Sequence, residues 1–194
     1  MTYPKKVRVR NKEYLINTDF RIAIECNSIA MDTDIGDYER ALAIIYKLFG
    51  DEGLNDAENH CELLELAQKY LSCGKELSSD VRQDEIDMDF EQDYDYIEAS
   101  FMSDYNIDLS TTEMHWWKFY NLINGLSNSE MGNCCVLNRV RNLRNYDTSQ
   151  IKDVKERTKI EKAKQQVALR KKEKALTKEQ IESAERFNRL AGIK

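Results

Sequence analysis

The chain has 194 residues, a formal net charge of -6 and a mean hydropathy of -0.68, with 41% hydrophobic and 33% charged residues. It is long enough for one domain with a hydrophobic core, and no apolar run approaches the roughly 18 residues of a membrane-spanning helix. One proline and seven glycines leave little to interrupt helices. The basic start, MTYPKKVRVR, has no apolar core, so we expect no secretion signal. Membrane, collagen-like and wholly disordered classes are therefore excluded.

The first elements predicted are a β-hairpin and three helices. Residues 6–16 alternate apolar and polar side chains on both sides of Asn11 and Lys12, where we expect the turn. Thr18 or Asp19 can cap the first helix, which begins near residue 20. Apolar periodicity, with glycines at the ends, predicts two further helices, over about 37–49 and 56–73. The hairpin must pack on these helices, because two strands alone are marginally stable.

The middle of the chain predicts a polar linker and then three more helices. Residues 74–90 lack an apolar period, so we expect an internal linker there. Helical spacing resumes near residue 94, and the pair Ser110 and Glu113 predicts a capping box before a strongly apolar helix that ends at Gly125. The last of the three helices is expected over about 134–143.

The charge is divided unevenly along the chain. Residues 1–138 contain 12 Lys/Arg and 27 Asp/Glu, a net charge of -15, whereas residues 139–194 contain 17 and 8, a net charge of +9. We therefore expect a mainly α protein, with a helical body and N-terminal hairpin over 1–146 and a basic helical arm over 147–194. A second capping box, Thr177 with Gln180, precedes an apolar stripe that needs a partner surface, either the body or another chain.

Acidic residues before the helix near residue 94 resemble a calcium-binding loop. Carboxylates occupy positions 1, 3, 5, 7, 9 and 12 of an EF-hand spacing between Asp87 and Glu98. However, Gln92 stands at position 6, where the sharp turn needs glycine. We therefore interpret these residues as a solvated, acidic approach to a helix N-terminus, and expect no metal site.

No residue pattern points to catalysis. The five cysteines contain no CxxC pair and lie mostly among apolar helical positions, which predicts reduced, buried thiols. His60 and His115 are the only histidines, and His115 is interpreted as a packed residue at the edge of the core. No phosphate-binding, dinucleotide-binding or hydrolase motif is present. We expect no enzymatic activity and no cofactor.

Trp116 and Trp117 are the strongest candidates for protein–protein contacts. Adjacent helical positions point about 100° apart, so one indole can be buried while the other lines a groove. Core packing of both is the favoured interpretation, although tryptophan is enriched in binding hot spots. The candidate partner-binding residues are Trp116, Phe119 and Tyr120 on this helix, and Ile181, Phe187 and Leu190 in the C-terminal stripe.

The segment DYDYIEASFMSDYNIDLSTTEMHWWKFYNLINGL, followed by VLNRVRNLR, resembles a family of small proteins from tailed phages and prophages of Gram-positive bacteria. The most specific part is MHWWKF with the LINGL that follows. In YNIDL, Asn106 stands where this family more commonly has glycine. The resemblance covers about residues 1–145, including the N-terminal hairpin.

This resemblance implies a tail assembly chaperone, because genes of the family lie between those of the major tail protein and the tape measure protein. The chain would bind the tape measure protein in the host bacterial cytoplasm and be absent from the mature virion. The major tail protein and a second copy of the chain are further candidate partners. Alternatives are a minor structural component of the particle and a small regulatory or anti-host factor. We do not expect nucleic-acid binding, because Phe187 is the one aromatic residue after Tyr146.

Overall fold

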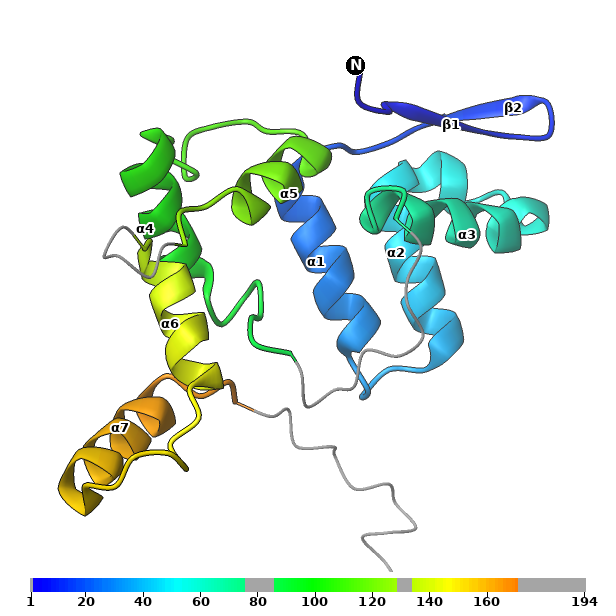
Figure 1. Cartoon of the computed structure of the whole chain (residues 1–194). Coiled ribbons are helices and arrows are strands. Elements are labelled where there is room, and N and C mark those ends of the chain that lie inside the picture. The colour runs from blue at the N-terminus through cyan, green and yellow to red at the C-terminus, as the bar shows by residue number, and fades with distance from the viewer. Residues whose placement is uncertain (1, 76–85, 129–133, 171–194) are drawn as a thin grey trace, which may run out of the picture.

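The computed structural model describes residues 2–75, 86–128 and 134–170, which form a mainly α-helical protein with a small hairpin (Figure 1). This confirms the predicted fold class. None of the described helices has the length and apolar character needed to cross a membrane. The elements are β1 (Lys6–Val9), β2 (Lys12–Leu15), α1 (Phe20–Met31), α2 (Asp37–Leu54), the short 3-10 helix η1 (Ala57–Asn59), α3 (His60–Leu71), α4 (Tyr94–Tyr105), α5 (Trp116–Asn124), α6 (Val136–Asn145) and α7 (Val154–Gln166).

The hairpin pairs antiparallel and lies across α2 and α3 (Figure 1). Val9 and Tyr14 are buried against the helices, while Leu15 on the opposite face is 74% exposed, as strand alternation requires. The turn falls on Arg10 and Asn11, one residue earlier than expected, and Arg10 adopts a positive φ of 51°. The alternating pattern therefore identified both strands but not the turn residues.

Helices α1, α2 and α3 pack in sequence order, α1 on α2 and α2 on α3. Asp19 caps α1 by accepting a hydrogen bond from the backbone N–H of Arg21 at 2.8 Å, as predicted. Gly50 does not end α2 but kinks it, with φ 65° and ψ -160°, a conformation available essentially to glycine alone. The helix then runs one further turn to Leu54.

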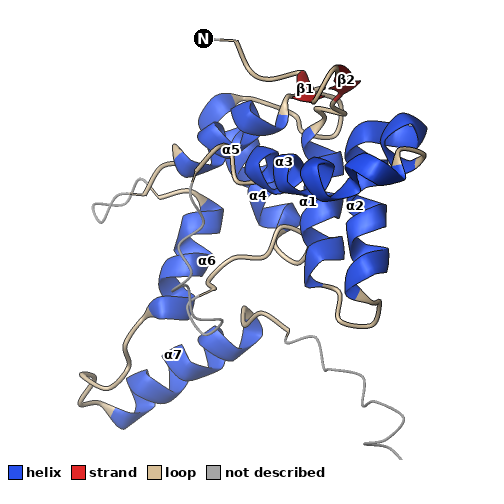
Figure 2. Cartoon of the chain, turned by 90° about the vertical axis from the view of Figure 1, so that its right-hand side faces the viewer, coloured by secondary structure: helices blue, strands red, loops and turns tan. Residues whose placement is uncertain are grey.

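The second half of the chain packs α4 on α6 and places α5 on α1 (Figures 1 and 2). α4 ends at Asn106, which is left-handed with φ 53° and donates its backbone N–H to the carbonyls of Phe101 and Met102. Asparagine tolerates this conformation better than other non-glycine residues. Asn106 thus performs the helix-ending task for which glycine is the usual residue.

The predicted arm includes α7, which follows α6 after a loop and lies beyond the end of α6, with its C-terminal end turned back toward the body (Figures 1 and 2). No residue of α7 is buried. The predicted capping box at Thr177 and the apolar stripe beyond it lie outside the described residues, as does most of the linker predicted over 74–90.

Candidate partner interface

Aromatic side chains from α1, α4 and α5 form the centre of the body. Phe119 is fully buried and stacks on Phe20 and Phe101, with ring centroids 4.6 and 5.1 Å apart. Trp116 is 1% exposed, and its ring centroid lies 5.8 Å from that of Phe119. Stacked aromatic pairs add stability beyond the area that they bury. This cluster therefore joins the first and second halves of the chain into one core.

The two adjacent tryptophans cap the C-terminal end of α3. The indole Nε1–H of Trp116 donates to the Leu71 carbonyl at 3.0 Å, and that of Trp117 donates to the Tyr70 carbonyl at 2.9 Å. The last carbonyls of a helix have no partner within the helix, so side-chain donors satisfy them. Both indoles thus have structural partners in the body.

Trp116 and Phe119 were candidate partner-binding residues, but both belong to the core, as the favoured interpretation of core packing predicted for Trp116. Both side chains are turned into the core and have almost no accessible surface. Tyr120 is half-buried, with the Lys75 ammonium 4.7 Å from the centre of its ring. The other candidates, Ile181, Phe187 and Leu190, lie outside the described residues.

Helices α1 and α5 begin side by side, joined by an antiparallel bridge between Asp19 and His115. Phe20 donates its backbone N–H to the Met114 carbonyl at 3.0 Å, and Trp116 donates to the Thr18 carbonyl at 2.8 Å. Two free N–H groups at helix N-termini are thereby satisfied by the backbone of the other segment.

His115 is the N-cap of α5. Its Nδ1 accepts a hydrogen bond from the backbone N–H of Trp117 at 3.0 Å, and its Nε2 lies 2.9 Å from the Pro4 carbonyl oxygen. An imidazole nitrogen that accepts carries no proton, so the proton resides on Nε2 and is donated to Pro4. The predicted capping box at Ser110 is wrong, because the Ser110 hydroxyl instead donates to Asp108 at 2.5 Å.

A buried ion pair connects the segment before α4 to α6. Asp93 is 1% exposed, and both of its carboxylate oxygens lie 2.7 Å from the Arg144 guanidinium. The hydrogen bond to Asp93 raises the pKa of Arg144 further above its ordinary value. A buried charge of this kind is tolerated because it is paired and hydrogen-bonded on both sides.

This ion pair corrects the interpretation of the acidic segment as solvated at Asp93, whereas Glu91 and Asp95 of the same segment are exposed as expected. Asp93 is buried, and Asp87 accepts a hydrogen bond from Arg141 at 3.1 Å. Asp89 accepts hydrogen bonds from two backbone N–H groups of the same turn. Among the residues that the structure describes, no group of three His, Cys, Asp or Glu side chains is placed to hold a metal ion.

Arg144 also holds the arm. Its Nε donates to the Val167 carbonyl at 2.6 Å, just beyond the end of α7. The Gln92 side chain accepts from the Arg170 backbone N–H at 2.8 Å and donates to the Arg170 carbonyl at 3.2 Å. The C-terminal end of α7 is therefore fixed to the body through the backbone of Val167 and Arg170. Sequence reasoning missed this role, although Arg141 and Arg144 are spaced to share one helix face.

An open pocket of about 470 Å³ lies between the exit of the hairpin and α2. Exposed Leu15 and Tyr46, 74% and 48% accessible, line it together with Ile22 of α1. The backbone around Gly50 forms part of the wall, where the Leu48 carbonyl accepts a hydrogen bond from the Asn17 N–H at 2.8 Å. The pocket thus presents apolar side chains to solvent beside a kinked helix.

The cysteines are all free thiols. Burial raises the pKa of Cys26 to about 12 and that of Cys73 to about 11, so both remain protonated near neutral pH. Protonated thiols are poor nucleophiles and poor metal ligands. Cys61 is exposed, which corrects the expectation of a buried thiol at this position.

These observations define a helical protein with a closed aromatic core, a basic arm held at the end of α7, and an open pocket lined by both apolar and polar residues. The family model described as Bacteriophage Gp15 protein matches residues 2–169. The chain therefore belongs to this bacteriophage protein family, and the match includes α7 and the contact that Arg144 makes to Val167. No curated protein and no solved structure matches the chain.

Proposed function

We propose that this bacteriophage protein is a tail assembly chaperone that binds the tape measure protein in the host bacterial cytoplasm and leaves before the virion is complete. Membership of a phage protein family supports the setting. The observation that carries the proposal is the pocket lined by exposed Leu15 and Tyr46. Apolar side chains left accessible on a folded protein are characteristic of partner-binding surfaces.

The pocket suits a helical client with an apolar face. An amphipathic helix binds by inserting a row of apolar side chains into a hydrophobic groove. Leu15 and Tyr46 supply apolar contacts. Lys47, which also lines the pocket, forms an ion pair with Glu25, with 2.6 Å between the ammonium and the carboxylate, and provides a polar edge. The net charge of -15 over residues 1–138 would keep such a complex in solution.

Co-expression with the tape measure protein tests the proposal. The full chain should render the tape measure protein soluble and co-purify with it. A Leu15→Glu/Tyr46→Glu variant should lose co-purification while keeping its fold, because Leu15 is 74% and Tyr46 48% exposed. The control is Ile86→Glu/Met102→Glu, which adds the same charge at two other exposed apolar positions and should retain binding.

Other outcomes would overturn the proposal in favour of a different role. Detection of the chain in purified virions by mass spectrometry, together with no binding to the tape measure protein, would indicate a structural component. A DNA gel shift that weakens steeply with salt, again without tape measure binding, would indicate a regulatory factor. Co-purification with the major tail protein alone would identify a different client.

A further inference from the structure

The body holds α7 through contacts at the C-terminal end of the helix, which leave the side chains at its N-terminal end free of the body in the described structure. The contacts from Arg144 and Gln92 reach the backbone of Val167 and Arg170, not their side chains. The ammonium of Lys164 likewise donates to a main-chain group, the carbonyl of Tyr146, at 2.5 Å. Helix α7 is therefore oriented by contacts at its C-terminal end, while none of its residues is buried.

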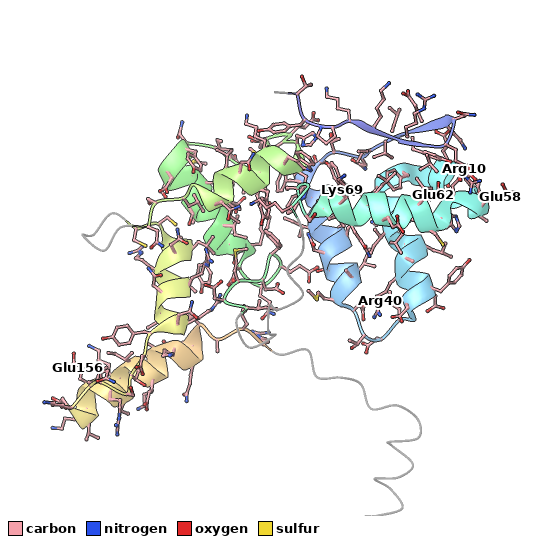
Figure 3. The ribbon with its side chains drawn as sticks, turned by 45° about the vertical axis from the view of Figure 1, so that its right-hand side comes forward. Arg10, Arg40, Glu58, Glu62, Lys69 and Glu156 are labelled. Atoms are coloured by element: carbon pink, nitrogen blue, oxygen red, sulfur yellow. The ribbon has the colours of Figure 1, made fainter. Side chains whose placement is uncertain are left out.

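The solvent-facing surface of α7 is basic. Lys155, Lys159 and Lys162 are exposed, and in the described part of the chain none of them forms an ion pair or hydrogen bond with the body. Arg157 pairs only within the helix, 3.9 Å from Glu161. Figure 3 shows the side chains of α7, including the labelled Glu156, projecting from the end farthest from the hairpin. Val154 at this end is 63% exposed, which adds an apolar contact point.

A surface with complementary character lies at the junction of α1 and α2. Met31 and Tyr38 are 64% and 70% exposed there, so two large apolar side chains stand in solvent. The residues around them carry negative charge, because one arginine, Arg40, accompanies four carboxylates, Asp32, Asp34, Asp37 and Glu39. We call Met31, Tyr38 and these carboxylates the acceptor surface.

We propose that α7 of one copy docks on the acceptor surface of a second copy. Charge complementarity favours this occupant, because Lys155, Lys159 and Lys162 would meet carboxylates while Val154 would meet Met31 and Tyr38. Docking of α7 on the acceptor surface of its own chain is excluded, because the contacts of Arg144 and Gln92 hold the end of α7 next to α6, away from the α1–α2 junction (Figures 1 and 2). The proposal goes beyond the proposed function and does not depend on it.

Nucleic acid is a poorer match for α7 than an acidic protein surface. The helix carries Glu156 and Glu161 among its cations, and residues 147–170 contain no aromatic side chain. Binding of single strands relies on aromatic stacking as well as positive charge. Glu156 and Glu161 would also lie near the phosphates of a nucleic acid, which repel carboxylates.

Such a contact is heterologous, because it joins two different surfaces of the same protein. Each copy would use its arm on one neighbour and its acceptor surface for another, which builds rings or open chains rather than a closed dimer. The mass should therefore rise with protein concentration. It should fall in high salt, because screening shortens the reach of exposed charges from about 10 Å at about 0.1 M salt to about 3 Å at about 1 M.

Light scattering coupled to size-exclusion chromatography measures the mass of the assembly formed by the full chain, after nuclease treatment. At about 0.1 M salt we expect masses above the monomer, and at about 1 M salt a return to the monomer. Lys155→Glu/Lys159→Glu/Lys162→Glu should be monomeric in both. The matched control Lys5→Glu/Arg8→Glu/Lys118→Glu changes the net charge equally at exposed cations outside the arm and should still associate.

Mixing two deficient variants gives the sharpest outcome. A Met31→Ser/Tyr38→Ser variant keeps the basic surface of α7 but lacks the apolar contacts of the acceptor surface. The Lys155→Glu/Lys159→Glu/Lys162→Glu variant keeps the acceptor surface but lacks the basic surface of α7. Each alone should be monomeric, whereas an equal mixture should form a complex of two chains, because only one contact is available. A monomeric wild-type chain, equal loss in the control, or a mass that disappears only with nuclease would overturn the proposal.

Discussion

The body and the arm of this protein are stabilised by different physical means. The body closes around stacked aromatic rings such as Phe119 and Phe101, both fully buried. The arm helix α7 has no buried residue and is attached by polar contacts from Arg144 and Gln92. Burial of apolar area is not directional, whereas hydrogen bonds fix an orientation.

This difference indicates that the body and α7 can lose their structure independently. Apolar burial makes the stability of the body depend on the volume of the side chains in its core. The arm depends instead on a few bonds and can open without unfolding the core, as low-stability elements do. Variants that separate global stability from arm protection therefore test the comparison directly.

The largest effect is expected from Phe119→Ala. The substitution removes a ring stacked between two others and leaves a cavity, which should lower the free energy of unfolding by about 4 kcal/mol. Urea denaturation followed by circular dichroism measures this change. Tyr38→Ala removes an aromatic side chain that is 70% exposed, and should change the stability by less than about 0.5 kcal/mol. Equal costs for the two variants would contradict the burial of Phe119.

Arg144→Ala should come next, with a cost of about 3 kcal/mol, because it leaves the buried Asp93 carboxylate without a compensating positive charge, with the Asp89 N–H as its remaining hydrogen-bond donor. It should also free the end of α7, so hydrogen exchange across residues 154–166 should become fast. Arg139→Ala, on the same helix but exposed, is the matched control and should leave both quantities unchanged.

A second variant separates the two tasks of Arg144. Gln92→Ala removes the hydrogen bonds to the Arg170 backbone without touching the buried pair. It should speed exchange in α7 while the free energy of global unfolding stays within about 0.5 kcal/mol of wild type. If Gln92→Ala destabilised the core as much as Arg144→Ala, arm and body would form one cooperative unit.

Sequence patterns predicted the elements of the fold well. Alternation identified the hairpin, helical spacing identified the helices, and residue type and place narrowed the cap of α1 to Thr18 or Asp19, of which Asp19 is the cap. These signals are local, so they can be read without the tertiary structure. The end predicted for α2 at Gly50 was displaced because tertiary packing continues the helix beyond the kink.

The candidate site could not be predicted to the same extent. Trp116 and Phe119 were chosen for their residue type, but burial depends on which helix covers them, and that is a long-range property. The Asp93–Arg144 pair joins residues 51 positions apart, and no local pattern pairs one carboxylate of an acidic run with one arginine. Likewise, His115 displaced the expected capping box because the backbone of Thr18 and Pro4 organises the start of α5.

A smaller effect is expected at this junction between the two halves. His115→Ala removes the side-chain acceptor for the Trp117 N–H and should cost about 1 kcal/mol. His115→Asn keeps an acceptor of a kind favoured at N-caps and should recover most of this loss, although it cannot stack on Tyr3 as the imidazole does at 5.0 Å. Urea denaturation measures the free energy of unfolding of both variants. Equal decreases for His115→Ala and His115→Asn would show that His115 contributes through ring packing and not through capping.

The smallest effect concerns the hairpin and appears as a pH dependence. The Asp56 carboxylate accepts hydrogen bonds from the Tyr14 hydroxyl at 2.6 Å and the Lys12 ammonium at 3.0 Å, which hold its pKa below the ordinary value of 3.8. The unfolded chain therefore binds the proton more readily, so this stabilisation is present above pH 3.8 and is lost as the pH falls through the lower, folded-state pKa. Wild-type stability should consequently fall more steeply in acid than that of Asp56→Asn, which has no carboxylate to protonate. Asp95→Asn, at an exposed carboxylate in the first turn of α4, should keep the wild-type slope. Equal slopes for wild type and Asp56→Asn would show that the Tyr14 contact does not favour the ionised carboxylate.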